Sequence, residues 1–225
     1  MTTTVVVITG ATPLSRRAVA AVAALVDETG DAGSGIVLVA ADGGLDHALA
    51  AGLRPTVLVG DLDSVTASGL AWASEHTTVV RHPVDKAATD TELAVAHAAS
   101  MGPQRILLVA GQGDRIDHAV AALGALGAPE LAAVGSLEAW GGDDELRVVH
   151  GPGTATLDRP AGTTFSVLAM HGPCRGVTIA NARWPLSDHD LQPLVGLGVS
   201  NQVAVAPVTV SVEHGIATVV VPEAN

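Results

Sequence analysis

Residues 36–64 read IVLVAADGGLDHALAAGLRPTVLVGDLDS. This stretch begins with an aliphatic run, Ile36–Ala40, passes through an alanine-rich segment, Leu45–Ala51, and ends in a second aliphatic run, Thr56–Val59. Uninterrupted runs of this kind are typical of strands buried on both faces, and the segment between them can form a helix. A strand, a helix and a strand in this order predict a parallel pair joined by a crossover.

The same alternation extends over residues 1–140. The further strands that we expect are Val5–Thr9, Thr77–Val80 and Ile106–Ala110. The further helices are Arg16–Glu28, Ser68–Glu75, Asp90–Met101 and Asp117–Leu126. The predicted fold class is therefore α/β, with a doubly wound, mostly parallel sheet in an N-terminal domain of residues 1–140.

The pattern changes after a predicted linker, Gly141-Gly142-Asp143-Asp144. The runs that follow are short and separated by glycine and proline: Arg147–His150, Thr154–Leu157, Thr164–Met170, Gly176–Ala180, Val203–Val212 and Ile216–Val221. His214-Gly215, between the last two runs, is a hairpin signal. Residues 145–225 are therefore predicted to form a C-terminal antiparallel β-sandwich.

Composition limits the partners. The 225 residues are 48% hydrophobic and 15% charged, which indicates a folded globular chain. A formal net charge of −12 repels phosphate backbones and anionic lipid, so we expect neither nucleic acid nor a membrane as a main partner. Cys174 is the only cysteine, and the longest apolar run near the N-terminus, Ala18–Val26, is too short for a membrane span. We expect a cytoplasmic protein.

Acidic segments follow four of the predicted strands. They are Ala41-Asp42-Gly43-Gly44, Gly60-Asp61-Leu62-Asp63-Ser64, Asp85-Lys86-Ala87-Ala88-Thr89-Asp90 and Gly111-Gln112-Gly113-Asp114-Arg115-Ile116-Asp117-His118. Ligands of open α/β sheets bind beyond the carboxyl ends of the strands. The sequence therefore predicts one rim of carboxylates around a ligand site.

Asp61 and Asp63 flank a single residue, so both carboxylates can approach one hard cation, with the Ser64 hydroxyl beside them. Mg²⁺ prefers such oxygen ligands and is commonly held by one or two carboxylates together with substrate phosphates. The alternative is that these residues only cap backbone N–H groups in a turn. Thr89 and Glu92 fit a helix capping box, which leaves Asp90 unexplained and free to face the same metal.

Several chemistries lack their motifs. There is no G-x-x-x-x-G-K-[ST] loop, no complete G-x-G-x-x-G and no G-x-S-x-G elbow. P-loop chemistry and covalent hydrolysis are therefore not predicted. His118 suits either a structural or a catalytic role, and Lys86, the only lysine, is either a surface residue or a cation kept for a site.

In order and spacing, these acidic segments resemble the motif series of the thiamine pyrophosphokinase family. Trp184-Pro185-Leu186 and Gly198-Val199-Ser200-Asn201 are similar to elements of that family's thiamine-binding β domain. The resemblance implies transfer of a pyrophosphoryl group from ATP to thiamine, giving thiamine diphosphate and AMP, with Mg²⁺ as cofactor. It also implies a homodimer whose thiamine site is shared between subunits.

The resemblance assigns roles by position. The metal ligands are Asp61, Asp63 and Asp90, and the catalytic set is Asp61, Asp63, Asp90, Arg115 and Asp117. With Lys86 and Thr89 added from the loop before Asp90, the expected ATP-binding set is Asp42, Gly43, Gly44, Ser64, Lys86, Thr89, Arg115, Asp117 and His118. The thiamine-binding set is Trp184, Ser200 and Asn201, although Trp184 also suits a core position.

Two departures from the family pattern are present: Asp114 replaces a glycine, and Ala87 replaces a common acid. Two alternatives stay open at this point. One is a pyrophosphokinase of the same architecture that acts on another heterocyclic alcohol, such as a pterin. The other is a non-catalytic module that binds a nucleotide or thiamine.

Overall fold

The structure, a computed structural model, describes residues 3–10, 12–28, 35–111 and 116–223. The chain divides into two compact units: residues 1–126 with 133–143, and residues 127–132 with 144–225. Residues 127–132, which the predicted boundary placed in the N-terminal domain, thus belong to the second unit. Within the described ranges, no helix has the length and apolar character needed to cross a membrane.

The first unit contains a parallel sheet in the order β6-β5-β1-β2-β3-β4. Its strands are β1 (Thr4–Ile8), β2 (Ile36–Ala41), β3 (Val57–Gly60), β4 (Thr78–Arg81), β5 (Arg105–Ala110) and β6 (Ser136–Gly141). The helices are α1 (Arg16–Glu28), α2 (Gly44–Ala50), α3 (Ala67–His76), α4 (Asp90–Ser100) and α5 (Ile116–Ala125). A short 3₁₀ helix, Pro129–Ala133, follows in the chain, and all but its last residue belong to the second unit. The predicted α/β class with a doubly wound sheet is confirmed.

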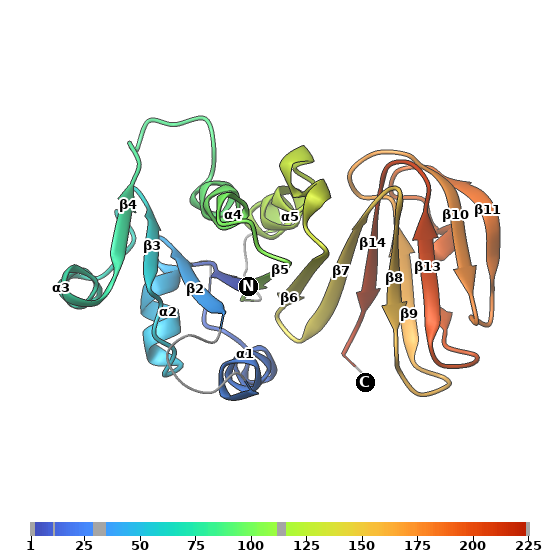
Figure 1. Ribbon diagram of the computed structural model, residues 1–225, viewed down its shortest axis with the longest axis horizontal. Helices are drawn as coiled ribbons and strands as arrows, with labels where there is room; N and C mark the ends of the chain where they lie inside the picture. The colour runs from blue at the N-terminus through green and yellow to red at the C-terminus, as the bar shows by residue number, and fades with distance from the viewer. Residues whose placement is uncertain (1–2, 11, 29–34, 112–115, 224–225) are drawn as a thin grey trace. The chain divides into compact units, whose positions relative to one another are not determined.

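Helices cover both faces of this sheet: α4 and α5 lie on one side, and α1 and α2 on the other (Figure 1). The central strands β1, β2, β3 and β5 are buried because each face supplies apolar side chains to a helix layer. Val6 and Leu38 pack with Val22 of α1, and Leu58 packs with Leu45 of α2. Burial on both faces explains why these strands are aliphatic without alternation.

The strand order reverses at β1. From β1 to β4 the chain moves toward one edge of the sheet, and β5 then pairs with the other side of β1. The loops after β1 and β5 therefore diverge, which opens a crevice at the carboxyl ends of these strands. The strand order alone therefore predicts that a ligand binds at the carboxyl ends of β1 and β5.

Strand β6 was not predicted. Its sequence, Ser136-Leu137-Glu138-Ala139-Trp140-Gly141, alternates polar with apolar residues, and Leu137 and Ala139 are its buried positions. A half-buried strand that alternates polar with apolar residues lacks the aliphatic run that identified the central strands. The predicted linker is in fact the end of β6, a turn at Gly142 and the start of the next strand at Asp144.

The second unit is an antiparallel β-sandwich, which confirms the prediction for this part of the fold class. Its two sheets have the orders β12-β9-β14-β7 and β11-β10-β13-β8. The strands are β7 (Asp144–His150), β8 (Gly153–Leu157), β9 (Thr164–Leu168), β10 (Cys174–Ala180), β11 (Leu186–Leu191), β12 (Asn201–Gln202), β13 (Val208–Val212) and β14 (Ile216–Val221). Both sheets contribute to one buried cluster that contains Phe165, Val177 and Val219.

Two predictions for this unit were wrong, and one strand was missed. Val203–Val212 is not one strand, because Pro207 has no N–H to donate and pairing resumes only at Val208. The turn at His214-Gly215 does not make a hairpin, since β13 and β14 pair within different sheets. Strand β11 was missed because four of its six residues are exposed and its middle is polar.

The sandwich core yields a stability prediction. Phe165 is fully buried, so Phe165→Ala should lower the free energy of unfolding by about 3–5 kcal/mol through lost burial and a cavity. Urea denaturation followed by circular dichroism measures this change. Val205→Ala, at a position that is 63% exposed, is the control and should change stability by less than about 0.5 kcal/mol. Equal effects of the two substitutions would contradict the assignment of Phe165 to the core.

Candidate active site

A cavity of about 430 Å³ lies in the first unit, at the carboxyl ends of the strands on both sides of the reversal. Thr9 and Gly10 after β1, Ala41 at the end of β2, and Ala110 and Gly111 at β5 line it. The other side is formed by the start of α4 and the first turns of α5. The cavity thus occupies the crevice that the strand order predicts.

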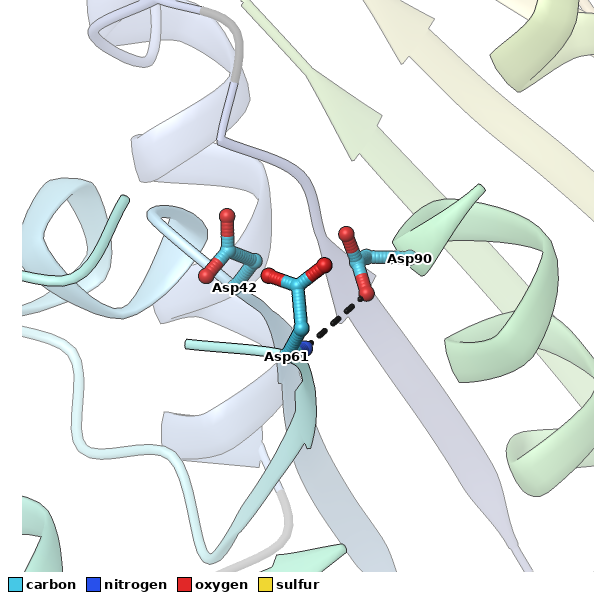
Figure 2. A group of neighbouring side chains, drawn as sticks. All are labelled: Asp42, Asp61 and Asp90. Atoms are coloured by element: carbon cyan, nitrogen blue, oxygen red, sulfur yellow. Dashed lines mark hydrogen bonds between the residues drawn. The ribbon is translucent and has the colours of Figure 1, made fainter. Parts of the chain in front are cut away.

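Three carboxylates converge beside this cavity, and two of them, Asp42 and Asp90, line it. Asp42 follows β2, Asp61 follows β3, and Asp90 is the first residue of α4; one oxygen atom from each lies within 4.8 Å of the others. Figure 2 shows the three side chains pointing toward one another. The Asp61 backbone N–H donates a hydrogen bond of 3.3 Å to Asp90 Oδ1, which fixes part of this arrangement.

Local backbone geometry aims these side chains. Asp42 has φ of 46° and Leu62 has φ of 71°, conformations that end the strands abruptly. The Asp42 N–H donates to Val59 O at 2.9 Å, which ties the loop after β2 to β3. Leu62 and Val65 are buried in the cluster beneath the loop after β3. Asp61, between β3 and this anchored segment, is only 8% exposed.

Lys86 neutralises part of this negative charge. Its Nζ lies 2.5 Å from Asp61 Oδ2 and 3.1 Å from Asp90 Oδ1, and its side chain is 13% exposed. The hydrogen bond from Lys86 holds the pKa of Asp61 below its usual value, and the same contact raises the pKa of Lys86. The only lysine of the chain is therefore part of the acidic site, and the alternative interpretation of Lys86 as a surface residue is wrong.

Asp42 has a different environment. Burial raises its pKa, and the nearby charges of Asp90 and Asp63 raise it further, while the Gly43 N–H and the nearby Ser64 hydroxyl lower it. Its Oδ1 atom is buried and receives no hydrogen bond from the described residues. A buried carboxylate oxygen without a donor is costly. A cation bound at the three carboxylates would remove that cost, so the donor set fits a hard metal ion.

The other residues predicted at the metal and nucleotide sites divide into two groups. Ser64, Thr89 and His118 line the cavity. Asp63 is exposed and outside the group of three; its N–H donates to Asp61 Oδ1 at 3.3 Å, and its Oδ1 accepts from Ser64 at 2.9 Å. Asp117 is exposed on α5, and Arg115 lies outside the described residues.

Two predicted details of the loops are present. Thr89 and Glu92 form the capping box that begins α4, which holds Asp90 in the first turn. Gly43 and Gly44 lie where α2 begins, and a Cβ on Gly44 would be 2.2 Å from Ile8 O. Only glycine lets α2 approach the end of β1 this closely, and Asp42 is thereby brought to the reversal of the sheet.

The predicted thiamine residues lie in the second unit. Trp184 is 52% exposed, so it is not a core tryptophan. Asn201 is buried; its Oδ1 accepts from the Trp184 N–H at 3.1 Å and from the Gln202 N–H at 2.8 Å, and its Nδ2 donates to Trp184 O at 2.7 Å. Ser200, with φ of 57°, donates its N–H to Ser166 Oγ at 3.1 Å. The structure thus brings Asn201 to the backbone of Trp184.

Two protein-family models match the chain. One, described as the thiamin pyrophosphokinase catalytic domain, matches residues 34–132, and the other, described as the thiamin pyrophosphokinase vitamin B1 binding domain, matches residues 154–217. The two matches follow each other in the order of the two structural units. The chain belongs to the thiamin pyrophosphokinase family.

Solved structures agree with this fold. A thiamin pyrophosphokinase family protein from Enterococcus faecalis is 22% identical, with a TM-score of 0.76 over 100% of both chains. A thiamin pyrophosphokinase from Geobacillus thermodenitrificans is 22% identical, with a TM-score of 0.77 over 99% of this chain and 98% of that one. The Candida albicans enzyme is 11% identical, with a TM-score of 0.74 over 97% of this chain and 88% of that one. No match was found among curated protein sequences.

Membership in the thiamin pyrophosphokinase family makes this chain an enzyme, a thiamine diphosphokinase. The matches give no support to a pterin pyrophosphokinase or to a non-catalytic module. The cavity also includes residues outside the predicted site sets, among them Thr9, Gly10 and Gly111 at the reversal. These residues lie at or directly after the ends of central strands, and that place in the sequence could have identified them.

The Lys86 contacts predict a pH-dependent effect on stability. Because the pKa of Asp61 is lowered, its ion pair stabilises the fold above the usual Asp pKa, and this contribution is lost as pH falls through the folded value. Because the pKa of Lys86 is raised, the pair persists up to that higher value. Lys86→Met should therefore lower the urea midpoint at about pH 7, and the difference from wild type should shrink toward about pH 3. A deficit independent of pH would contradict this origin.

Proposed function

We propose that this enzyme transfers a pyrophosphoryl group from ATP to the hydroxyl of thiamine at the cavity of the first unit, using Mg²⁺ held by Asp61 and Asp90. The observation that carries the proposal is the convergence of three carboxylates within 4.8 Å at the end of a parallel sheet. Asp42, whose Oδ1 lacks a hydrogen-bond donor within the described residues, would complete the set. Mg²⁺ bound there supplies neutralisation of the charge on the transferred phosphates.

Asp63 is proposed to act at the outer side of the same metal. It is exposed, and its backbone already contacts Asp61, so its free carboxylate oxygen can hold a metal-bound water or a second cation. Ser64, which donates to Asp63, orients that carboxylate. This arrangement suits Mg²⁺, which keeps several waters when it binds substrate phosphates.

The phosphates of ATP are proposed to lie along the glycines of the cavity. Gly10 and Gly111 line the cavity, and Gly43 directly follows Asp42, which also lines it. Glycines carry no side chain that would keep a phosphate from their backbone N–H groups. Lys86 already contacts two of the acids and can pair with a phosphate oxygen as the metal enters. Phosphoryl transfer depends on positioning and charge neutralisation more than on covalent catalysis. The residues are therefore suited to this reaction without a nucleophile.

Further ATP contacts are proposed for residues on the helical side of the cavity. Thr89 and His118 line it and present a hydroxyl and an imidazole there. Gly44, Asp117 and Arg115 stay in the predicted set, with Arg115 and Asp117 as the catalytic partners of the metal-binding acids. A basic side chain at Arg115 would stabilise charge on the departing phosphates.

Asp61 provides the direct test. Asp61→Asn keeps the volume of the side chain but removes a negative ligand, and it should lower kcat/KM by about 100-fold or more. A steady-state assay of AMP and thiamine diphosphate across a Mg²⁺ titration measures the loss. Asp27→Asn, at an exposed position of α1, is the matched control and should keep full activity. Activity of Asp61→Asn within about tenfold of wild type at saturating Mg²⁺ would contradict the metal assignment.

Thiamine is proposed to stack on Trp184. Arg183 covers one face of the indole, with its Cζ 4.7 Å from the ring centroid, and its Nη1 donates to Gln202 Oε1 at 2.8 Å. The ring is therefore held from one side while the exposed remainder is available to a planar, cationic ligand. Asn201 and Ser200 serve this site by fixing the loop that carries the indole.

A homodimer with a shared thiamine site is part of the proposal. Four apolar side chains of the second unit are exposed in the segment before Asn201: Leu194, Val195, Leu197 and Val199. Exposed apolar residues grouped in one segment are typical of an association surface. Its partner is proposed to be a second copy of this chain in a reducing cytoplasm, which suits the single buried thiol of Cys174.

Trp184→Ala should raise the KM for thiamine by about 5–30-fold, equivalent to about 1–2 kcal/mol, with little change in the KM for ATP. Trp184→Phe keeps an aromatic face and should raise the KM for thiamine less.

If the site is shared, mixing Trp184→Ala with Asp61→Asn should return about a quarter of the native sites, because half of the random dimers are mixed and each has one intact site. Unchanged thiamine KM in Trp184→Ala, or no recovery in proven mixed dimers, would contradict the stacking or the sharing respectively.

A further inference from the structure

Asp46, on α2, contacts the segment that follows the acidic loop. Its Oδ2 accepts a hydrogen bond of 2.8 Å from the Thr66 N–H, and its Oδ1 accepts one of 2.6 Å from Thr66 Oγ1. Asp46 does not line the cavity and is not a member of the three-carboxylate group. Its carboxylate is instead committed to a single partner residue through two hydrogen bonds.

Thr66 is where the acidic loop becomes a helix. It is the N-cap of α3, with its Oγ1 accepting from the Gly69 N–H at 3.0 Å and lying 3.1 Å from Ser68 Oγ. Asp46 therefore holds the cap residue itself, through its backbone and its side chain. The loop from Asp61 to Val65 is fixed at its far end by this contact.

The fit between α2 and α3 is close. A Cβ added to Gly69 would lie 2.5 Å from Asp46 Oδ1 and 3.0 Å from Val65 Cγ1, so the carboxylate occupies space that only a glycine leaves. Leu45, which precedes Asp46 in α2, packs in the same buried cluster as Leu62 and Val65 of the loop. Apolar packing and a polar contact thus join the same two segments.

This contact links two of the three acids. Asp42 stands two residues before the start of α2, and Asp61 stands at the start of the loop that ends at Thr66. We infer that Asp46 is a positioning residue: by holding Thr66, it fixes the loop of Asp61 relative to α2 and so keeps Asp61 within metal-binding reach of Asp42. The inference rests on the proposed Mg²⁺ site. Asp46 acts through Thr66 and lies outside both the cavity lining and the three-carboxylate group.

A role of Asp46 in positioning and a role of its negative charge predict different results for Asp46→Asn. The amide oxygen can accept from the Thr66 N–H, and the amide NH₂ can donate to Thr66 Oγ1, whose own proton then turns toward Ser68 Oγ. Both contacts survive while the charge is lost. Asp46→Ala removes both contacts, and Thr66→Val removes the hydroxyl.

The test measures Mn²⁺ binding, as a paramagnetic substitute for Mg²⁺, by electron paramagnetic resonance on the full chain without nucleotide. Asp46→Ala should weaken Mn²⁺ binding by about tenfold, the loss typical of residues that orient metal ligands. Thr66→Val should weaken it in the same direction, and Asp46→Asn should stay within about twofold of wild type. Combining Asp46→Ala with Thr66→Val should add little to the larger single effect, because the two residues form one contact.

Two control variants separate positioning from general loss of helix stability. Thr77→Val removes the hydroxyl that donates to Ala73 O at 2.8 Å at the other end of α3, and Glu75→Gln removes an exposed carboxylate from the same helix. Both should bind Mn²⁺ as wild type does. Amide hydrogen exchange adds a metal-independent readout: exchange of residues 61–66 should accelerate in Asp46→Ala and not in Thr77→Val.

The outcomes are distinct. Wild-type affinity for Mn²⁺ and unchanged exchange of residues 61–66 in Asp46→Ala would overturn the positioning role while leaving the proposed function in place. An Asp46→Asn protein as weak as Asp46→Ala would overturn it in favour of charge. A wild-type protein that binds no Mn²⁺ would overturn the metal site, and with it this inference.

Discussion

Repulsion among carboxylates is the constraint on which the site depends. Asp42, Asp61 and Asp90 come from three separate segments, and their oxygens lie close enough that a cation among them would lower their repulsion. Lys86 answers part of this need by contacting two of the acids, while the buried Oδ1 of Asp42 has no donor in the described part of the chain. A site that is acidic, rigidly held and incompletely neutralised is suited to bind a divalent metal with its anionic substrate.

The rigidity comes from elements that do no chemistry. Gly44 lets α2 approach the end of β1, the capping box of Thr89 and Glu92 sets the first turn of α4, and Asp46 holds the loop after β3. Each of these contacts fixes the end of one acidic segment, where the next helix begins. Together these contacts prevent repulsion among the carboxylates from moving the loops apart. Packing of the surrounding fold therefore offsets the unfavourable electrostatic energy of the three close charges.

The second unit follows a different design. Here the residue proposed to meet the ligand, Trp184, is exposed, and the polar group near it, Asn201, is buried and satisfied by backbone partners. The asparagine therefore acts as a support for the tryptophan loop. An aromatic face held in place by a buried amide and by Arg183 matches a planar ligand that is recognised by stacking.

The sequence alone determined the α/β and β-sandwich classes, because strands buried on both faces must be aliphatic and short alternating strands must be separated by turns. It also determined the acidic loops, because residues after parallel strands converge whatever the details. It did not predict β6 or β11. β6 is half-buried and β11 is a largely exposed edge strand with a polar middle, so neither has a run of aliphatic residues. Only the tertiary structure decided that Asp42 joins Asp61 and Asp90 while Asp63 stays outside, that Lys86 lies among them, and that Asp46 holds their loop. These facts depend on distances between segments far apart in the chain, which spacing along a sequence does not contain.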